Sequence, residues 1–140
     1  MFNLSENPNL NNYYAHSKDG SSPETFIEHS NRTAKYRDKI FETFELNEIY
    51  RSLLTDIGVE CDKTLKYIRK IIELHDIGKL SNAFQDKLIN NIKNKATHSD
   101  IGFFSIIYLL NKEIIAKQIS PKEFIVLFFL TYTVYRHHGK

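Results

Sequence analysis

The sequence predicts an all-α domain that forms a compact bundle of five to six helices. Apolar residues recur at spacings of three and four along most of the chain, which is the period of an amphipathic helix. No stretch of useful length alternates apolar and polar residues as a half-buried strand would. The 140 residues are 41% hydrophobic and 26% charged, with five glycines and three prolines. This composition is typical of one packed domain and not of a disordered or fibrous chain.

Residues 1–21 are expected to be an irregular lead-in, because residues 1–12 contain five asparagines and show no periodicity. The first helix is expected to begin at Ser22, which can cap a helix, followed by Pro23 at the first helical position. Its apolar stripe includes His29, which is therefore expected to face inward. The stripe is formed by Phe26, His29, Thr33, Tyr36, Ile40 and Phe44.

Residues 46–57 predict a second helix that ends near Gly58, where a glycine can adopt the left-handed conformation. Asp62 is expected to cap a third helix. Continuing the apolar stripe of that helix by one step leads to His75, and Gly78 is expected to break the helix.

Residues 81–92 predict a short helix and residues 97–115 a longer one. Gly102 and Ser105 lie on the same face of the longer helix as His98. Both are small enough to let another helix or a ligand approach that face.

The last helix is expected to begin at Ser120 and Pro121. It is apolar nearly all round between Phe124 and Leu130. A helix of this kind is usually buried, so we expect it to be the central helix of the bundle.

The sequence indicates a cytoplasmic protein with no membrane partner. The longest apolar stretch, residues 124–134, is shorter than the roughly 20 residues that cross a bilayer. The start of the chain has neither the basic nor the apolar segment of a secretory signal. Cys61 is the one cysteine, so no internal disulfide can form, which suits a reducing compartment.

Charge is distributed unevenly along the chain. Residues 1–60 carry six Lys and Arg against ten Asp and Glu (net −4), whereas residues 61–140 carry thirteen against seven (net +6). A basic second half permits a polyanionic partner but does not require one.

Five histidines follow the lead-in, and most of them fall on helix faces or ends that are predicted to point inward. A single buried histidine is usually an ordinary core residue, but a cluster of them beside Asp76 is costly to bury unless a cation satisfies it. A metal ion is the simplest such cation. An adjacent imidazole and carboxylate, His75 and Asp76, can converge on one ion, and the carboxylate can bridge two. Lys79 could neutralise a phosphate oxygen, or could be an ordinary surface lysine.

The chain resembles the HD nuclease domain of type I CRISPR systems, which occurs fused to a helicase or as a separate subunit. The motifs that carry the resemblance are spread over nearly the whole chain. They are Tyr14-Ala15-His16-Ser17, Glu28-His29-Ser30, His75-Asp76-Ile77-Gly78-Lys79, Thr97-His98-Ser99 and Arg136-His137-His138-Gly139.

The resemblance implies an HD-domain fold over residues 22–140 and a metal-dependent nuclease, an endonuclease or an exonuclease, that hydrolyses single-stranded DNA in CRISPR interference. It implies two metal ions. The first would be held by His29, His75 and Asp76, and the second by Asp76 as a bridge with His98, His137 and His138. Lys79 would assist at the phosphate, and His16 would lie near the site without being a ligand. Imidazole-rich ligation favours Mn, Fe, Co or Ni, with Mg as a further possibility.

The implied partners are single-stranded DNA, a CRISPR helicase subunit or domain and a guide-RNA surveillance complex. The family normally completes the first metal site with an aspartate beyond the double histidine, whereas no aspartate follows Asp100 here. We therefore expect either a fragment that lacks the family's C-terminal helices or an incomplete first site. Two alternatives stay open, an HD-fold phosphohydrolase acting on nucleotides and a catalytically incomplete helical docking module of a CRISPR effector.

Overall fold

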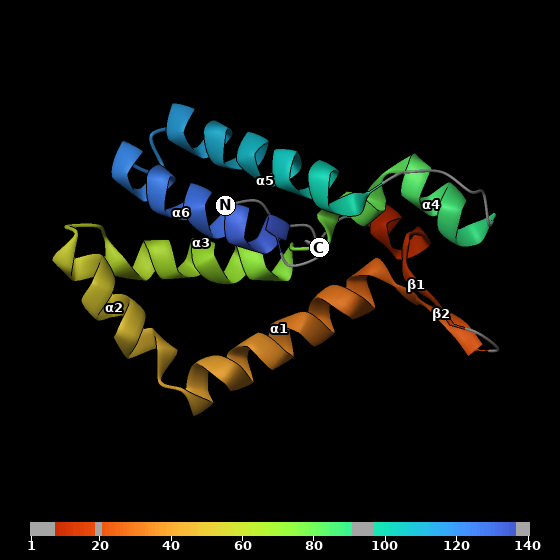
Figure 1. Cartoon of the computed structure of the whole chain (residues 1–140), viewed down its shortest axis with the longest axis horizontal. Helices are drawn as coiled ribbons and strands as arrows, with labels where there is room; N and C mark the ends of the chain where they lie inside the picture. Colours follow the sequence, from red (N-terminus) through yellow and green to blue (C-terminus); the bar gives the residue numbers. More distant parts are fainter. Residues whose placement is uncertain (1–7, 19–20, 91–96, 137–140) are drawn as a thin grey trace.

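The computed structural model describes residues 8–18, 21–90 and 97–136. Six α-helices in these residues confirm the predicted all-α fold class (Figure 1). The helices are α1 (Phe26–Thr43), α2 (Leu46–Asp56), α3 (Cys61–Glu73), α4 (Asn82–Ile89), α5 (His98–Ile115) and α6 (Pro121–Tyr135). They are accompanied by two 3-10 helices, η1 (Pro8–Asn12) and η2 (Ile77–Leu80), and by the strands β1 (Tyr14–Lys18) and β2 (Ser21–Thr25).

Helix α3 is the centre of the bundle. It contacts α1, α2 and α6, while α5 packs against α6 and η2. Figure 1 shows α5 and α6 side by side along one side of α3, with α1 running obliquely along the other. The apolar residues at the centre are almost completely buried, and they include Ile68, Ile71, Leu74, Ile106, Leu110 and Leu127.

The prediction that the last helix is the central one is wrong. Leu127 of α6 is fully buried, but Ile125 is 55% exposed and Phe129 is 64% exposed. Helices α3 and α5 cover only part of the surface of α6, because α3, with its single strongly apolar face, occupies the central position. No helix among the described residues is long and apolar enough to cross a bilayer.

Helix α1 begins three residues later than predicted and buries only part of the predicted stripe. Thr25 caps it and forms a reciprocal capping box with Glu28, so Ser22 and Pro23 belong to strand β2. Phe26 is buried, whereas Tyr36 is 62% exposed. Phe41, near the end of α1, is also buried, so the helix stays in contact with the core while Tyr36 faces solvent.

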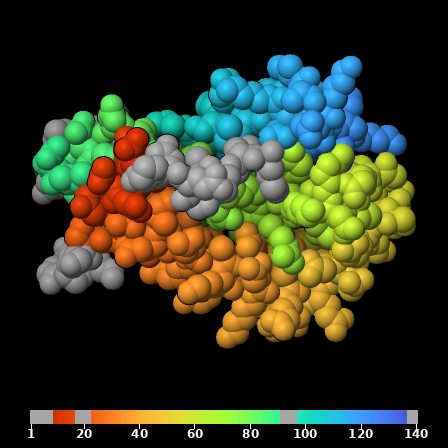
Figure 2. All heavy atoms as spheres, turned by 180° about the vertical axis from the view of Figure 1, so that it is seen from behind, coloured from red at the N-terminus to blue at the C-terminus, as the bar shows by residue number. Residues whose placement is uncertain are grey.

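A β-hairpin replaces part of the expected irregular lead-in. Strands β1 and β2 pair antiparallel, with His16 opposite Glu24 and irregular register on either side of that pair. The strands are short and lack an alternating apolar pattern, so they could not be predicted from the sequence. Figure 2 shows this N-terminal region and α4 gathered at one end of the molecule.

Candidate metal centre

Asp76 lies in the turn that joins α3 to η2. Helix α3 ends at Glu73, earlier than predicted, and the turn is closed by hydrogen bonds from the backbone of Ile77 to Leu74 (2.9 Å) and of Lys79 to Asp76 (2.8 Å). This turn directs the Asp76 side chain into the molecule, where the residue is only 3% exposed.

Gly78 lets the N-terminus of α5 approach this turn closely. A Cβ atom at Gly78 would lie 1.8 Å from the backbone oxygen of His98 and 2.7 Å from the backbone nitrogen of Gly102. The expectation that Gly102 permits the approach of another segment is confirmed, since its own Cβ position faces the Gly78 backbone at 3.4 Å. The lack of a side chain at Gly78 therefore allows η2 and α5 to pack closely, which brings His98 beside Asp76.

Four basic side chains converge on the Asp76 carboxylate. Three of them face the Oδ2 atom, namely His29 (Nε2, 3.0 Å), His75 (Nε2, 3.2 Å) and Lys79 (Nζ, 2.7 Å). The Nε2 atom of His98 faces the other oxygen, Oδ1, at 3.2 Å. Lys79 is 3% exposed, so it is not a surface lysine.

These neighbours keep Asp76 ionised. Burial alone would raise the pKa of the carboxyl, but the imidazoles of His29, His75 and His98 outweigh burial and hold its pKa far below the usual range. The centre therefore contains a buried negative charge with two separately oriented oxygens.

The orientation of the histidines suits metal ligation. His75 Nδ1 lies 3.1 Å from the carbonyl oxygen of Ile72, which can only accept a hydrogen bond. The Ile72 carbonyl orients the ring through Nδ1, so Nε2 is the atom that faces Asp76 and would be available to a metal ion. His29 Nε2 is buried and, among the described residues, lacks the alignment of a hydrogen bond although it lies 3.0 Å from Asp76 Oδ2.

The donor set fits a divalent metal. One potential ligand atom each from His29, His75 and Asp76 lies within 4.8 Å of the other two. Imidazole nitrogen and carboxylate oxygen together suit first-row transition metals.

Glu24 is a further residue of the centre that the sequence did not reveal. Its Oε2 atom lies 3.3 Å from His29 Nδ1 and 2.9 Å from Arg32 Nη2, and the residue is 7% exposed. The positive charge of Arg32 disfavours a metal between Glu24 and His16, so Glu24 acts on the orientation of His29. No sequence signal pointed to Glu24, because only the hairpin buries it.

His16 lies beside the centre, as expected. Its ring centroid is 5.0 Å from that of His29, and its Nε2 atom is 3.3 Å from Lys79 Nζ. Partial burial, followed by the positive charge of Lys79, lowers the pKa of His16 below 6.5. A neutral His16 can accept a hydrogen bond from the lysine.

Gln85 of α4 connects the hairpin to the Asp76 turn. The Tyr14 backbone N–H donates to Gln85 Oε1 (3.0 Å), and Gln85 Nε2 donates to the carbonyl oxygens of Tyr14 (2.9 Å) and Lys79 (2.7 Å). A side-chain amide thus holds β1, and with it His16, next to Lys79.

The structure brings together all five of the predicted site residues that it describes. His29, His75, Asp76, Lys79 and His98 form one cluster. The other two predicted ligands, His137 and His138, lie outside the described residues.

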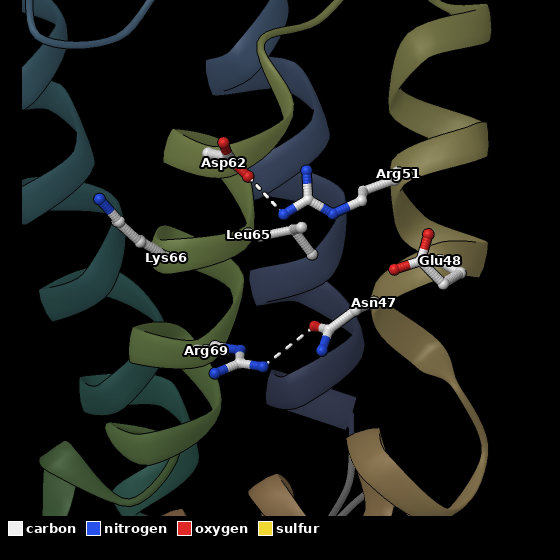
Figure 3. Close-up of a pocket in the computed structure, with 7 residues that line it drawn as sticks. All are labelled: Asn47, Glu48, Arg51, Asp62, Leu65, Lys66 and Arg69. Carbon is white, nitrogen blue, oxygen red and sulfur yellow. Dashed lines mark hydrogen bonds and ion pairs between the residues drawn. The ribbon is translucent and has the colours of Figure 1, made fainter.

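A separate cavity of about 410 Å³ lies between α2 and α3 (Figure 3). Arg51 Nη2 lies 2.5 Å from Asp62 Oδ1, and Arg69 Nη2 donates to Asn47 Oδ1 at 3.0 Å. Its lining contains none of the residues that converge on Asp76 and consists of Asn47, Glu48, Arg51, Asp62, Leu65, Lys66 and Arg69. Since both guanidinium groups already have acceptors, this cavity is a weaker candidate than the Asp76 cluster.

The chain was compared with known protein families, curated proteins and solved structures. The family model described as Cas3, HD domain, matches residues 15–140. Comparisons with curated proteins and with solved structures found no match. The matched range contains every side chain that converges on Asp76. The chain therefore belongs to the Cas3 HD domain family, the HD-type nuclease domains of type I CRISPR systems.

Proposed function

We propose that this domain hydrolyses single-stranded DNA in CRISPR interference by a mechanism in which two divalent ions share Asp76. One observation carries the proposal. The two oxygens of the Asp76 carboxylate face different histidines, with His29 and His75 on Oδ2 and His98 on Oδ1. A carboxylate in this arrangement can bridge two ions.

Each side chain has a definite part in this proposal. His29, His75 and Asp76 would hold one ion, and Asp76 with His98, His137 and His138 would hold the other. Bound divalent ions supply a hydroxide near neutral pH and stabilise the charge that develops on the phosphate. The imidazole content favours Mn, Fe, Co or Ni, with Mg as a further possibility.

Lys79 would stabilise the negative charge that develops on the scissile phosphate. Its ammonium group lies 2.7 Å from Asp76 Oδ2 and is almost fully buried, so its position is fixed relative to the metal ligands. A fixed positive charge in a site of low polarity stabilises a developing negative charge more strongly than a mobile surface lysine does.

A strand is a better substrate for this centre than a mononucleotide. His75 lines a surface hollow of about 310 Å³ whose rim includes Tyr36, a residue that is 62% exposed. An open hollow lets a strand pass, whereas a mononucleotide phosphohydrolase encloses its ligand. We further infer that the domain works in the cytoplasm with a CRISPR helicase and a guide-RNA surveillance complex, as the family implies.

The test is cleavage of circular single-stranded DNA by the purified chain in Mn²⁺, compared with the variant Asp76→Asn. We expect cleavage by the unaltered chain and none by the variant. Linear strands, duplex DNA and mononucleotides complete the panel. If only mononucleotides were hydrolysed, the domain would be a nucleotide phosphohydrolase and the proposed function would be wrong. Cleavage retained by Asp76→Asn would exclude the bridging role.

The variant Asp76→Asn needs a stability control, because it leaves the Lys79 ammonium buried without its carboxylate partner. Removing one member of a buried ion pair typically costs about 3–5 kcal/mol. The double variant Asp76→Asn Lys79→Met removes both charges and is expected to recover part of that free energy of unfolding. Urea unfolding of the three proteins shows whether a loss of cleavage reflects chemistry or unfolding.

A further inference from the structure

We propose that the hollow beside His75 binds one nucleobase of the substrate strand, with Tyr36 as the stacking platform. The inference rests on the proposed function, since it supposes that a nucleic-acid strand reaches the metal centre. It adds a recognition element that lies outside the cluster around Asp76.

The hollow is built from three helices and begins at a metal ligand. Its volume is about 310 Å³, and it is lined by Thr33 and Tyr36 of α1, Ile72 of α3, His75 of the turn that follows α3, and Val134 of α6. Thr33 and His75 are its polar residues, and the other three lining residues are aromatic or aliphatic. A flat heterocycle suits such a hollow, because its faces are apolar and its edges are polar.

The spacing along α1 places the hollow next to the scissile position. His29, Thr33 and Tyr36 share one face of the helix, because they are separated by four and three residues. Two helical turns separate His29 from Tyr36, which corresponds to about 10 Å along the axis. A phosphate held at the centre and a base at Tyr36 can therefore belong to neighbouring parts of one strand.

The exposure of Tyr36 has no structural explanation in the core. The side chain lies on the apolar stripe of α1 yet is 62% exposed. Lys39 lies one turn after Tyr36 and is exposed, while Arg32, one turn before it, is paired with Glu24 at 2.9 Å. An exposed positive charge next to an aromatic ring can contact a phosphate beside a stacked base, as in proteins that bind single strands without sequence preference.

The test compares Tyr36→Ala with Tyr36→Phe in two assays. The first is the anisotropy of a short fluorescent oligothymidylate without divalent metal, which reports binding alone. The second is Mn²⁺-dependent cleavage of the same oligonucleotide. Tyr108→Ala is the matched control, because Tyr108 is similarly exposed (59%) but lies on α5.

We expect Tyr36→Ala to weaken oligothymidylate binding about tenfold or more, and Tyr36→Phe and Tyr108→Ala to bind like the unaltered chain. An oligonucleotide of the same length with abasic sugars should bind Tyr36→Ala and the unaltered chain equally. Equal weakening on both oligonucleotides, or no weakening on either, would overturn the proposal. The two proposals fail separately. Failure to cleave DNA would refute the proposed nuclease function, whereas the base site is tested by the binding assay, which needs no hydrolysis.

Discussion

At the scale of single residues, the carboxylate of Glu24 determines how His29 presents itself to the metal centre. Glu24 accepts from His29 Nδ1 at 3.3 Å and is itself held by Arg32 at 2.9 Å. This contact favours the proton on Nδ1 and leaves Nε2 for a metal. A carboxylate that holds a metal-binding histidine through its other ring nitrogen typically contributes 10- to 100-fold to metal affinity.

Replacing Glu24 with Gln is therefore expected to weaken Co²⁺ binding by roughly 10- to 100-fold. The visible absorption spectrum of bound Co²⁺ should also change, because the geometry of His29 as a ligand is altered. Titration followed by absorption spectroscopy measures both effects. Glu42→Gln, at an exposed position on α1, is the control. An unchanged spectrum and affinity in Glu24→Gln would show that Glu24 has only a structural role.

The residues of the centre that could be predicted from the sequence are those that stand in short motifs. His75, Asp76 and Lys79 are close in the chain, so their proximity in space follows from one turn. Glu24 and Gln85 could not be predicted, because their contacts depend on a hairpin and a helix that are placed by tertiary packing.

At the scale of elements, the contact between η2 and α5 decides whether His98 reaches Asp76. Gly78→Ala is expected to be severely destabilising or to displace α5, since the added Cβ would lie 1.8 Å from the backbone of His98. Overpacking of this kind typically costs about 1–3 kcal/mol and sometimes more. Thermal unfolding and metal titration of the variant measure the two effects.

The control for this substitution is Gly102→Ala, whose Cβ would meet its nearest neighbour at 3.4 Å. A contact at this distance requires only a small adjustment, so we expect a much smaller loss. If Gly78→Ala were as stable as Gly102→Ala and bound metal normally, the close approach of η2 and α5 would not matter for the centre.

The start of α6 makes stability depend on pH. Burial alone would raise the pKa of Glu123, but Lys63 (2.8 Å) and the Ser120 backbone N–H lower it below 4.5. A carboxyl whose folded pKa is depressed stabilises the protein above its unfolded pKa, and this contribution is lost as the pH falls through the folded pKa. The free energy of unfolding is therefore expected to fall below about pH 4.5.

Glu123→Gln is expected to flatten this pH dependence and to cost roughly 1.5–3 kcal/mol at neutral pH, because a hydrogen bond to a charged group is lost. Urea unfolding at a series of pH values measures both quantities. The exposed Glu42→Gln should leave the curve unchanged. A parallel curve for Glu123→Gln would contradict the role of this carboxyl.

The sequence predicted helices more reliably than their positions in the bundle. Capping residues and apolar period place α5 and α6 within a few residues, because both signals are local. Which helix is central depends on how the apolar faces of several helices pack against one another. Phe129 and Tyr36, predicted inside and found exposed, show that apolar character alone does not settle this.

At the scale of the whole molecule, α5 and α6 present apolar side chains outward. Phe104 is 68% exposed and Phe129 is 64% exposed. Exposed apolar surface of this kind promotes association. We expect the purified chain to associate with increasing concentration, and the double variant Phe104→Ser Phe129→Ser to associate less at nearly unchanged fold stability. Sedimentation equilibrium measures this, and a strictly monomeric unaltered chain would contradict it.

The central claim is that the cluster around Asp76 binds divalent metal, and Mn²⁺ binding followed by electron paramagnetic resonance tests it most directly. The unaltered chain should bind Mn²⁺. Lys79→Met should bind at least as tightly, since the ammonium group 2.7 Å from Asp76 Oδ2 competes for the same oxygen. The double variant Asp76→Asn Lys79→Met should lose binding while remaining folded. Equal affinity in Lys79→Met and in the double variant would contradict the assignment of Asp76 as the shared ligand.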